Sequence, residues 1–178
     1  MIRLFAAIKV PHEVAAQLST MRGSLGNARW IEPDDYHITL RFAGVIDLHL
    51  AGELDHELAQ IQRAPFMLAI QGLDQFGGDK PRSLFARVKP SDELNGLQAQ
   101  VDRCAARAGI EAEKRKFVPH VTLARFNHVP NVAVAEFLSV RGYFEALEFR
   151  VDCFGLFSTN GLKGGGPYRL EREYAFAT

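Results

Sequence analysis

Two short stretches of the chain place a histidine and a threonine two residues apart. They read HITL, beginning at His37, and HVTL, beginning at His120. An imidazole titrates near neutral pH, so one copy can accept a proton while the other donates one. The hydroxyls of Thr39 and Thr122 can donate to the non-bridging oxygens of a phosphate, and an arginine can neutralise their charge. The pattern therefore predicts displacement at phosphorus, in which an attacking hydroxyl loses a proton and a leaving oxygen gains one.

Both motifs lie in stretches whose composition favours β-strands. Val, Ile, Thr and Phe are common in strands, whose side chains alternate between two faces. In the first stretch the histidine and Thr39 then share one face, while Ile38 and Leu40 point to the other. Arg41 lies two residues after Thr39, so a regular strand would place it on the Thr39 face, where it could help to bind phosphate. One such motif alone would indicate a structural histidine, but two copies with the same threonine partner favour a functional interpretation.

The elements around the motifs alternate between strands and helices. Strands are predicted at residues 2–10, 37–45, 66–73, 83–88, 118–126, 146–157 and 168–176. Helices are predicted after Pro11, after an N-cap at Asp47, between an N-cap at Ser91 and a terminating Gly109, and at residues 132–140. The chain has about one helix for every two strands, and this order of elements occurs twice. The repetition indicates an α+β fold with internal pseudo-symmetry. A tandem duplication would place the two polar faces opposite each other across a cleft.

The composition is that of a globular protein. The chain has 178 residues, of which 47% are hydrophobic, and this fits one domain or two small lobes that share a core. Lys plus Arg and Asp plus Glu are both 21, so the formal net charge is zero. A balanced chain is not built to coat long nucleic acids, which requires a basic field, but it can bind one phosphate or a nucleic-acid end locally.

The sequence predicts neither membrane attachment nor a metal site. No stretch approaches the ~20 apolar residues that span a bilayer, and the N-terminal apolar run is too short for a secretory signal. We therefore expect a soluble cytoplasmic protein, and a monomer. Cys104 and Cys153 form no metal or redox motif and are expected to be reduced thiols. The motifs lack the clustered carboxylates or paired ligands of a catalytic zinc or magnesium ion, so we expect no metal and no cofactor.

The double motif resembles the paired signatures of the two-histidine phosphoesterase superfamily. Further stretches resemble its bacterial and archaeal branch, the RNA 2′,3′-cyclic phosphodiesterases, also called the LigT-like or 2′-5′ RNA ligase-like family. They are RLFAAIKVP from Arg3, the pair Arg29-Trp30, PHVTLAR from Pro119 and GPYRLEREYAF from Gly166. The resemblance runs nearly end to end. It implies a single bilobal phosphoesterase domain over residues 1–178, with pseudo-two-fold symmetry, two antiparallel-rich sheets lining a central cleft, and helices outside.

The resemblance also implies a role for each motif residue. His37 and His120 would be the catalytic pair, Thr39 and Thr122 would bind phosphate, and Arg125 would help to hold it. The second histidine would activate water, and the first would protonate the departing ribose 3′ oxygen. The expected reaction is opening of 2′,3′-cyclic phosphates at RNA ends or on nucleotides to give 2′-phosphomonoesters. Spacing alone does not distinguish the acid from the base.

Alternative functions remain open from the sequence. Other substrates within the enzyme class are ADP-ribose cyclic phosphate and 2′-5′ oligoadenylate, and the reverse reaction is 2′-5′ RNA ligation. A protein of another class would bind RNA ends or nucleotides without turnover. The intact His–Thr pairs argue against that class, because arginine and lysine would serve phosphate binding better.

Two further groups of residues could contact RNA. The basic segment 114–116 could steer an anionic RNA end toward the second motif, although a solvated turn is an equal expectation. Four aromatic residues could stack a base, although core packing is the expectation for each. These residues are Phe5, Trp30, Tyr36 and Phe42.

Overall fold

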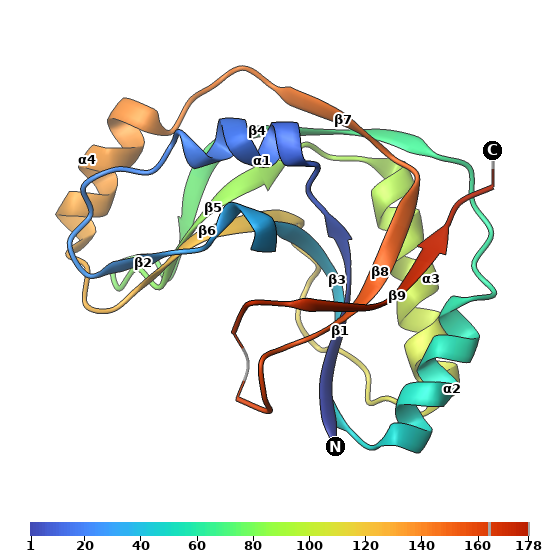
Figure 1. Ribbon diagram of the computed structural model, residues 1–178. Helices are drawn as coiled ribbons and strands as arrows, with labels where there is room; N and C mark the ends of the chain where they lie inside the picture. The colour runs from blue at the N-terminus through green and yellow to red at the C-terminus, as the bar shows by residue number, and fades with distance from the viewer. Residues whose placement is uncertain (164, 178) are drawn as a thin grey trace.

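The computed structural model describes residues 1–163 and 165–177 (Figure 1). Its elements in chain order are β1 (Ile2–Lys9), α1 (His12–Ser19), β2 (Ala28–Trp30), the 3-10 helix η1 (Pro33–Asp35), β3 (His37–Ile46), α2 (Leu48–Leu58), β4 (Phe66–Phe76), β5 (Ser83–Val88), α3 (Asp92–Ala108), β6 (His120–Phe126), α4 (Asn131–Arg141), β7 (Leu147–Val151), β8 (Cys153–Ser158) and β9 (Arg169–Ala175). The α+β class predicted from the sequence is confirmed.

The strands form one curled antiparallel sheet in which the two motif strands are central neighbours. The strand order is β7-β4-β5-β6-β3-β1-β8-β9, and β2 attaches to β6. Every pairing is antiparallel. Three strands follow β6 on one side and three follow β3 on the other, so the two halves have the same arrangement.

The two motif strands pair with each other at one residue pair. Ile38 pairs with Val121, and this is the pairing between β3 and β6 in the described residues. The two sheets predicted from the sequence are therefore continuous through this pair. Ile38 and Val121 are the middle residues of the two motifs, and both side chains lie in the main core. The sheet face opposite this core carries the motif histidines and threonines, and we call it the histidine face.

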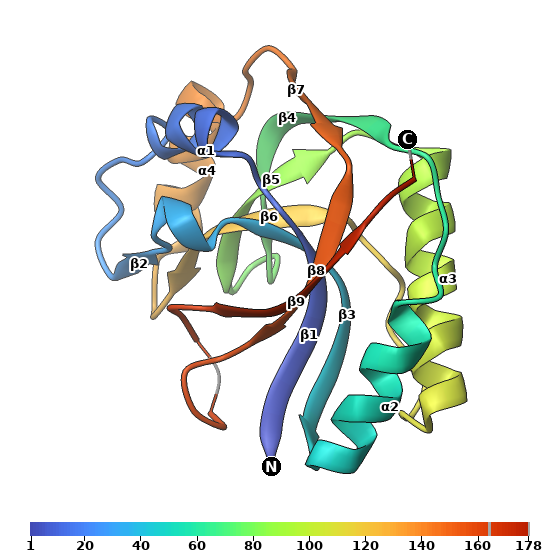
Figure 2. The ribbon, with the colours of Figure 1, turned by 45° about the vertical axis from the view of Figure 1, so that its right-hand side comes forward.

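The helices divide between the two halves of the sheet. α2 and α3 pack against each other and contact β1 and β3, whereas α4 contacts β4 and α1 contacts β7 (Figures 1 and 2). The predicted start of α2 and both predicted ends of α3 are confirmed. Asp47 accepts a hydrogen bond from the Leu50 amide at 2.8 Å, Ser91 accepts one from the Leu94 amide at 3.1 Å, and Gly109 ends α3 with φ at 95°.

The predicted helix at residues 132–140 is also confirmed, as α4, despite its β-branched residues. No helix in the described part of the chain has the length and apolar character needed to cross a membrane.

The prediction of one strand at residues 146–157 is wrong. The segment forms β7 and β8, which are separated by Asp152 and lie in different halves of the sheet. β7 pairs with β4, while β8 pairs with β1 and β9. The chain therefore crosses between the halves here. The apolar pattern of residues 146–157 is continuous because β7 and β8 are both partly buried. The pattern contains no information on which strands each of them pairs with.

Each motif strand carries a β-bulge at the leucine of its motif. In β3, Leu40 is the extra residue between the pairs that Thr39 and Arg41 form with β1. Leu123 occupies the same place in β6, whose register with β5 shifts there. A bulge adds one residue to one strand, so the alternation of faces moves by one position after it.

The bulge turns Arg41 away from the histidine face. Its side chain is 6% exposed, and its Nη2 donates a hydrogen bond to the backbone oxygen of Glu111. Its Nε lies 3.5 Å from the carboxylate of Asp102 in α3. The prediction that Arg41 shares the Thr39 face is therefore wrong, because the strand is not regular at Leu40. Arg41 instead ties β3 to α3 and to the loop that follows α3.

We expect Arg41→Met to lower the free energy of unfolding by about 1–3 kcal/mol, since it removes a charge-assisted hydrogen bond and the partner of Asp102. Arg103 lies on the exposed face of α3, the helix that carries Asp102, and Arg103→Met is the matched control. We expect it to change the free energy of unfolding by less than about 0.5 kcal/mol. Urea denaturation measures both values. Equal effects of the two substitutions would contradict the anchoring role of Arg41.

Candidate active site

The two motif histidines are held in the same way by the backbone. Nδ1 of His37 lies 2.7 Å from the carbonyl oxygen of Asp35, and Nδ1 of His120 lies 2.6 Å from that of Val118. A carbonyl oxygen can only accept, so these bonds assign the proton of each neutral ring to Nδ1. Nε2 of each ring is then left as a proton acceptor.

Burial keeps both imidazoles neutral near pH 7. Desolvation is the main cause that lowers the pKa of His37 to about 4, and the charges of His120 and Arg125 act in the same direction. Desolvation also lowers the pKa of His120, with a further contribution from Arg125. The antiparallel pairing of Ile38 with Val121 places His37 and His120 on adjacent strands, and Arg125 lies on the same strand as His120. The structure therefore brings together the two histidines and the arginine that the sequence singled out.

Aromatic rings provide the dry environment of His37. The Phe5 ring centroid lies 4.9 Å from the imidazole, and the Tyr168 ring packs edge-on at 5.0 Å. The backbone amide of Tyr168 donates a hydrogen bond of 3.1 Å to the carboxylate of Asp35. The segment before β9 is thereby fixed against the start of β3. No local pattern around Tyr168 predicts its contact with His37, although the stretch GPYRLEREYAF contains this residue.

His120 is packed by an equivalent pair of aromatic rings from the other half. Phe76 lies 4.9 Å and Phe85 lies 5.3 Å from its imidazole, both in edge-on orientations. Phe76 and Phe85 also stack on each other at 4.1 Å. Each histidine thus has aromatic surface beside it, which limits water access and ring rotation.

Apart from Arg41, the groups predicted to bind phosphate are available to a ligand. Thr39 and Thr122 are half-buried, and neither hydroxyl forms a hydrogen bond with another residue in ranges 1–163 and 165–177. Arg125 is exposed, and its guanidinium has no ion pair within those ranges. Two hydroxyl donors and one cation therefore accompany the two imidazoles.

The bulges give Arg125 and Phe42 equivalent positions, each five residues after its motif histidine. Phe42 is 45% exposed, and its ring lies 5.9 Å from that of Phe5. Among the four aromatic candidates, Phe5 and Tyr36 are buried, and Trp30 packs on Phe137 at 6.0 Å. Phe42 is the candidate that keeps an exposed ring.

The described residues contain no cluster of three or more His, Cys, Asp or Glu side chains that could hold a metal ion. The arrangement can instead move protons. Two neutral imidazoles, two free hydroxyls and one arginine suit a reaction in which one ring removes a proton and the other supplies one to an anionic phosphate ester.

Comparison with known proteins gives a consistent result. The family model described as "2'-5' RNA ligase superfamily" matches residues 10–162. A protein of Aeropyrum pernix named RNA 2′,3′-cyclic phosphodiesterase is 32% identical over 172 residues, which cover 93% of this chain and 98% of the relative. A protein of Bacillus subtilis with the same name is 34% identical over 127 residues, covering 68% of this chain and 69% of the relative.

Solved structures share the fold. The crystal structure of E. coli LigT complexed with 3′-AMP aligns with a TM-score of 0.83. The sequence identity is 23%, and the alignment covers 99% of each chain. The likeness extends over both halves of the sheet.

The low pKa of His37 makes folding depend on pH. The folded protein disfavours the protonated ring, whereas the unfolded chain protonates it near the ordinary value of 6.5. The contribution of His37 to stability is therefore complete above that value and is lost as the pH falls toward 4. Relative to His37→Gln, we expect the native chain to lose about 3 kcal/mol of unfolding free energy between about pH 7 and pH 4. Urea denaturation across this range measures the difference, and a constant difference would contradict the burial of the ring.

Proposed function

Since the chain belongs to the 2′-5′ RNA ligase superfamily, we propose that it hydrolyses 2′,3′-cyclic phosphates at RNA ends or on nucleotides to 2′-phosphomonoesters, without a metal ion. The observation that carries this proposal is the matched pair of imidazoles, each of which donates its Nδ1 proton to the backbone carbonyl two residues earlier. The relatives named RNA 2′,3′-cyclic phosphodiesterase, at 32% and 34% identity, support cyclic phosphodiesterase activity.

In the proposed reaction His120 acts as the base and His37 as the acid. Nε2 of His120 takes a proton from water, and the water oxygen forms a bond to phosphorus. The bond between phosphorus and the ribose 3′ oxygen breaks, and protonated His37 gives its proton to that oxygen. Thr39, Thr122 and Arg125 bind the non-bridging oxygens, where charge increases in the transition state. Each histidine then exchanges its proton with solvent, so both return to their starting forms.

The role of His37 as the acid requires the protonated ring in the complex. Burial lowers the pKa of the ring to about 4 in the free protein, so substrate binding must raise it toward the working pH. The phosphodiester anion stabilises the imidazolium form in the complex, so substrate binding supplies the protonated state. General acid and base catalysis contribute roughly 10²–10⁴-fold each.

We further propose that residues 1–178 act as one bilobal phosphoesterase domain, monomeric and cytoplasmic. The support for a single domain is the main hydrophobic core, which is one cluster that includes residues from both halves of the sheet, such as Ile8 and Leu123.

The reaction is tested with 2′,3′-cyclic AMP, with and without EDTA. We expect 2′-AMP to form at the same rate in both conditions, because the histidines and not a metal ion move the protons. Chromatographic separation of 2′-AMP from 3′-AMP shows which ribose oxygen leaves the phosphorus atom. Formation of 3′-AMP would reverse which oxygen leaves, and loss of activity in EDTA would contradict the metal-independent reaction.

The two roles are tested with a substrate whose 3′ oxygen is replaced by sulfur, a leaving group that departs without a proton. On the normal cyclic phosphate, His37→Ala and His120→Ala should each lose at least ~10²-fold in kcat, because each removes one proton transfer. On the sulfur analogue, the loss for His37→Ala should largely disappear while that for His120→Ala remains. His12→Ala, an exposed histidine in α1, is the control. The opposite pattern of rescue would exchange the roles, and near-native rates for both variants would contradict the mechanism.

A further inference from the structure

A second arginine lies beside Arg125 on the histidine face. Arg29 of β2 pairs with Arg125 of β6, and residues directly opposite each other in an antiparallel pair have side chains on the same face of the sheet. The two neighbours of Arg29 in β2, Ala28 and Trp30, pack against the core, so the alternation of faces also directs Arg29 to the histidine face. Both arginines are exposed. The mechanism described above uses Arg125 and does not use Arg29.

The two positive charges of this pair are not neutralised by the described part of the chain. Neither guanidinium forms an ion pair or a hydrogen bond with any residue in ranges 1–163 and 165–177. Like charges directly opposite each other in a sheet are destabilising. A bound anion removes this repulsion, and arginine binds phosphate through two parallel hydrogen bonds. The pair is therefore suited to hold more phosphate charge than Arg125 holds alone.

β2 places Arg29 on the same edge of β6 as His37. β5 pairs with one edge of β6 over residues 120–125, so β3 and β2 both pair with the other edge. β3 pairs at Val121 and β2 at residues 124–126, so the two strands follow each other along β6 (Figure 1). Because β3 runs antiparallel to β6, its first residue, His37, lies at the end that is nearer to β2. Arg29 therefore lies beyond the imidazole and not on the far side of β6.

The register of β5 gives the distance between His37 and Arg29 along the strand direction. The β5 partners of Thr122 and Arg125 are two residues apart, and a strand rises about 3.3 Å per residue. The row that contains Arg125 and Arg29 therefore lies roughly 7 Å from the row of Thr122. The antiparallel pairing of β3 with β6 directs His37 toward the row of Thr122. This spacing is comparable to the length of one sugar–phosphate unit of a nucleic acid.

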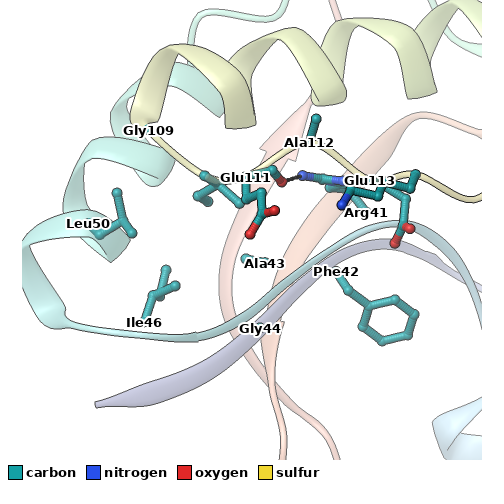
Figure 3. A pocket seen from close by; sticks show the side chains of 12 residues that line it. Arg41, Phe42, Ala43, Gly44, Ile46, Leu50, Gly109, Glu111, Ala112 and Glu113 are labelled. Carbon is teal, nitrogen blue, oxygen red and sulfur yellow. Dashed lines mark hydrogen bonds between the residues drawn. The ribbon is translucent and has the colours of Figure 1, made fainter.

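The opposite end of the histidine face carries an aromatic ring in place of the cation pair. There the side chain that follows the bulge is Phe42, which β1 pairs on one edge of β3, while no strand in the described residues pairs with the other edge beside it. The loop 109–114 passes this edge and lines a pocket of about 480 Å³ (Figure 3). Figure 3 shows Phe42 and Arg41 on opposite sides of β3, and the pocket lies on the side of Arg41, away from the histidines. The two ends of the histidine face therefore differ in charge.

The proposed reaction leaves two directions for the rest of an RNA chain. Because the ribose 3′ oxygen departs at His37, the sugar lies on the β3 side of the reacting phosphate. The 5′ carbon of that sugar, and the phosphate attached to it, then lie either toward Arg29 or toward Phe42. A phosphate forms charge-assisted hydrogen bonds with an arginine and gains no such bond from a phenyl ring. The charge on the histidine face therefore favours the direction of β2.

We infer that Arg29 binds the phosphate on the 5′ side of the nucleotide that carries the cyclic phosphate. The inference rests on the proposed function and deepens it, because it makes an RNA end, and not a nucleoside cyclic phosphate, the better substrate. Arg125 holds the reacting phosphate, Arg29 holds the next one, and the RNA chain leaves the site over β2.

The test compares three substrates that end in the same adenosine 2′,3′-cyclic phosphate. The 5′ oxygen carries a hydrogen in 2′,3′-cyclic AMP, a phosphate in its 5′-phosphorylated form, and a second adenosine through a phosphodiester in the ApA dinucleotide. For the native protein, kcat/KM should be about 10-fold higher for both substrates with the 5′ phosphate than for 2′,3′-cyclic AMP. The gain should appear in KM, because Arg29 does not contact the atoms that react.

Substitution of Arg29 should remove this preference. In Arg29→Met, the ratio of kcat/KM between the dinucleotide and 2′,3′-cyclic AMP should fall from about 10 to about 1. Arg29→Lys should give an intermediate ratio, since it keeps the charge but loses the paired hydrogen bonds. Arg103→Met removes the same charge from an exposed site on α3 and should keep the native ratio. Both substrates are measured on one preparation, so the ratio does not depend on the fraction of folded protein.

The outcomes separate this inference from the proposed function. Absence of turnover on all three substrates would overturn the proposed function, and the inference with it. Turnover of all three at equal kcat/KM, or a native preference that survives in Arg29→Met, would overturn the inference alone. A gain for the dinucleotide without a gain for the 5′-phosphorylated substrate would assign the preference to the second nucleoside, and the reverse would limit it to free nucleotides. Both of these results also contradict binding of the RNA phosphate by Arg29.

Discussion

The pairing of Ile38 with Val121 is the contact on which the active site depends. It joins two halves that otherwise have separate strands and separate helices, and it lies between the histidine and the threonine of both motifs. Because strand residues alternate between faces, burying these two apolar side chains directs all four polar motif residues to the opposite face. One apolar contact in the core therefore sets where the imidazoles meet. The geometry of the site is a consequence of core packing and not of contacts among the polar groups themselves.

The two halves share a frame but differ in the side chains that the frame presents. Both motif strands have a bulge at the leucine of the motif. After the bulge, the next side chain on the histidine face is in both strands the fifth residue after the motif histidine. In one half this side chain is the cation Arg125, and in the other it is the ring of Phe42. The repeated backbone therefore carries a cation in one half and an aromatic ring in the other. A reaction in which one oxygen attacks and another leaves uses such asymmetry.

Local signals in the sequence predicted most of the elements and the residues of the site. The caps at Asp47 and Ser91, the terminating glycine of α3 and the period of two in the motif strands depend on neighbouring residues, so the sequence displays them directly. The errors concern information that local patterns do not contain. The face of Arg41 depends on a bulge, and the division of residues 146–157 depends on which strands each part meets. The packing of Tyr168 on His37 joins segments that are far apart in the chain.

That last contact links His37 to one edge of the sheet. β9 is an edge strand that pairs with β8 on one side, and the residues that precede it cover His37. Edge elements open locally at a lower free energy than the core does. When this hairpin opens, water reaches the ring, the desolvation that lowers its pKa is lost, and the ring becomes an ordinary histidine. The environment of His37 can therefore change while the core and the Ile38–Val121 pair stay folded.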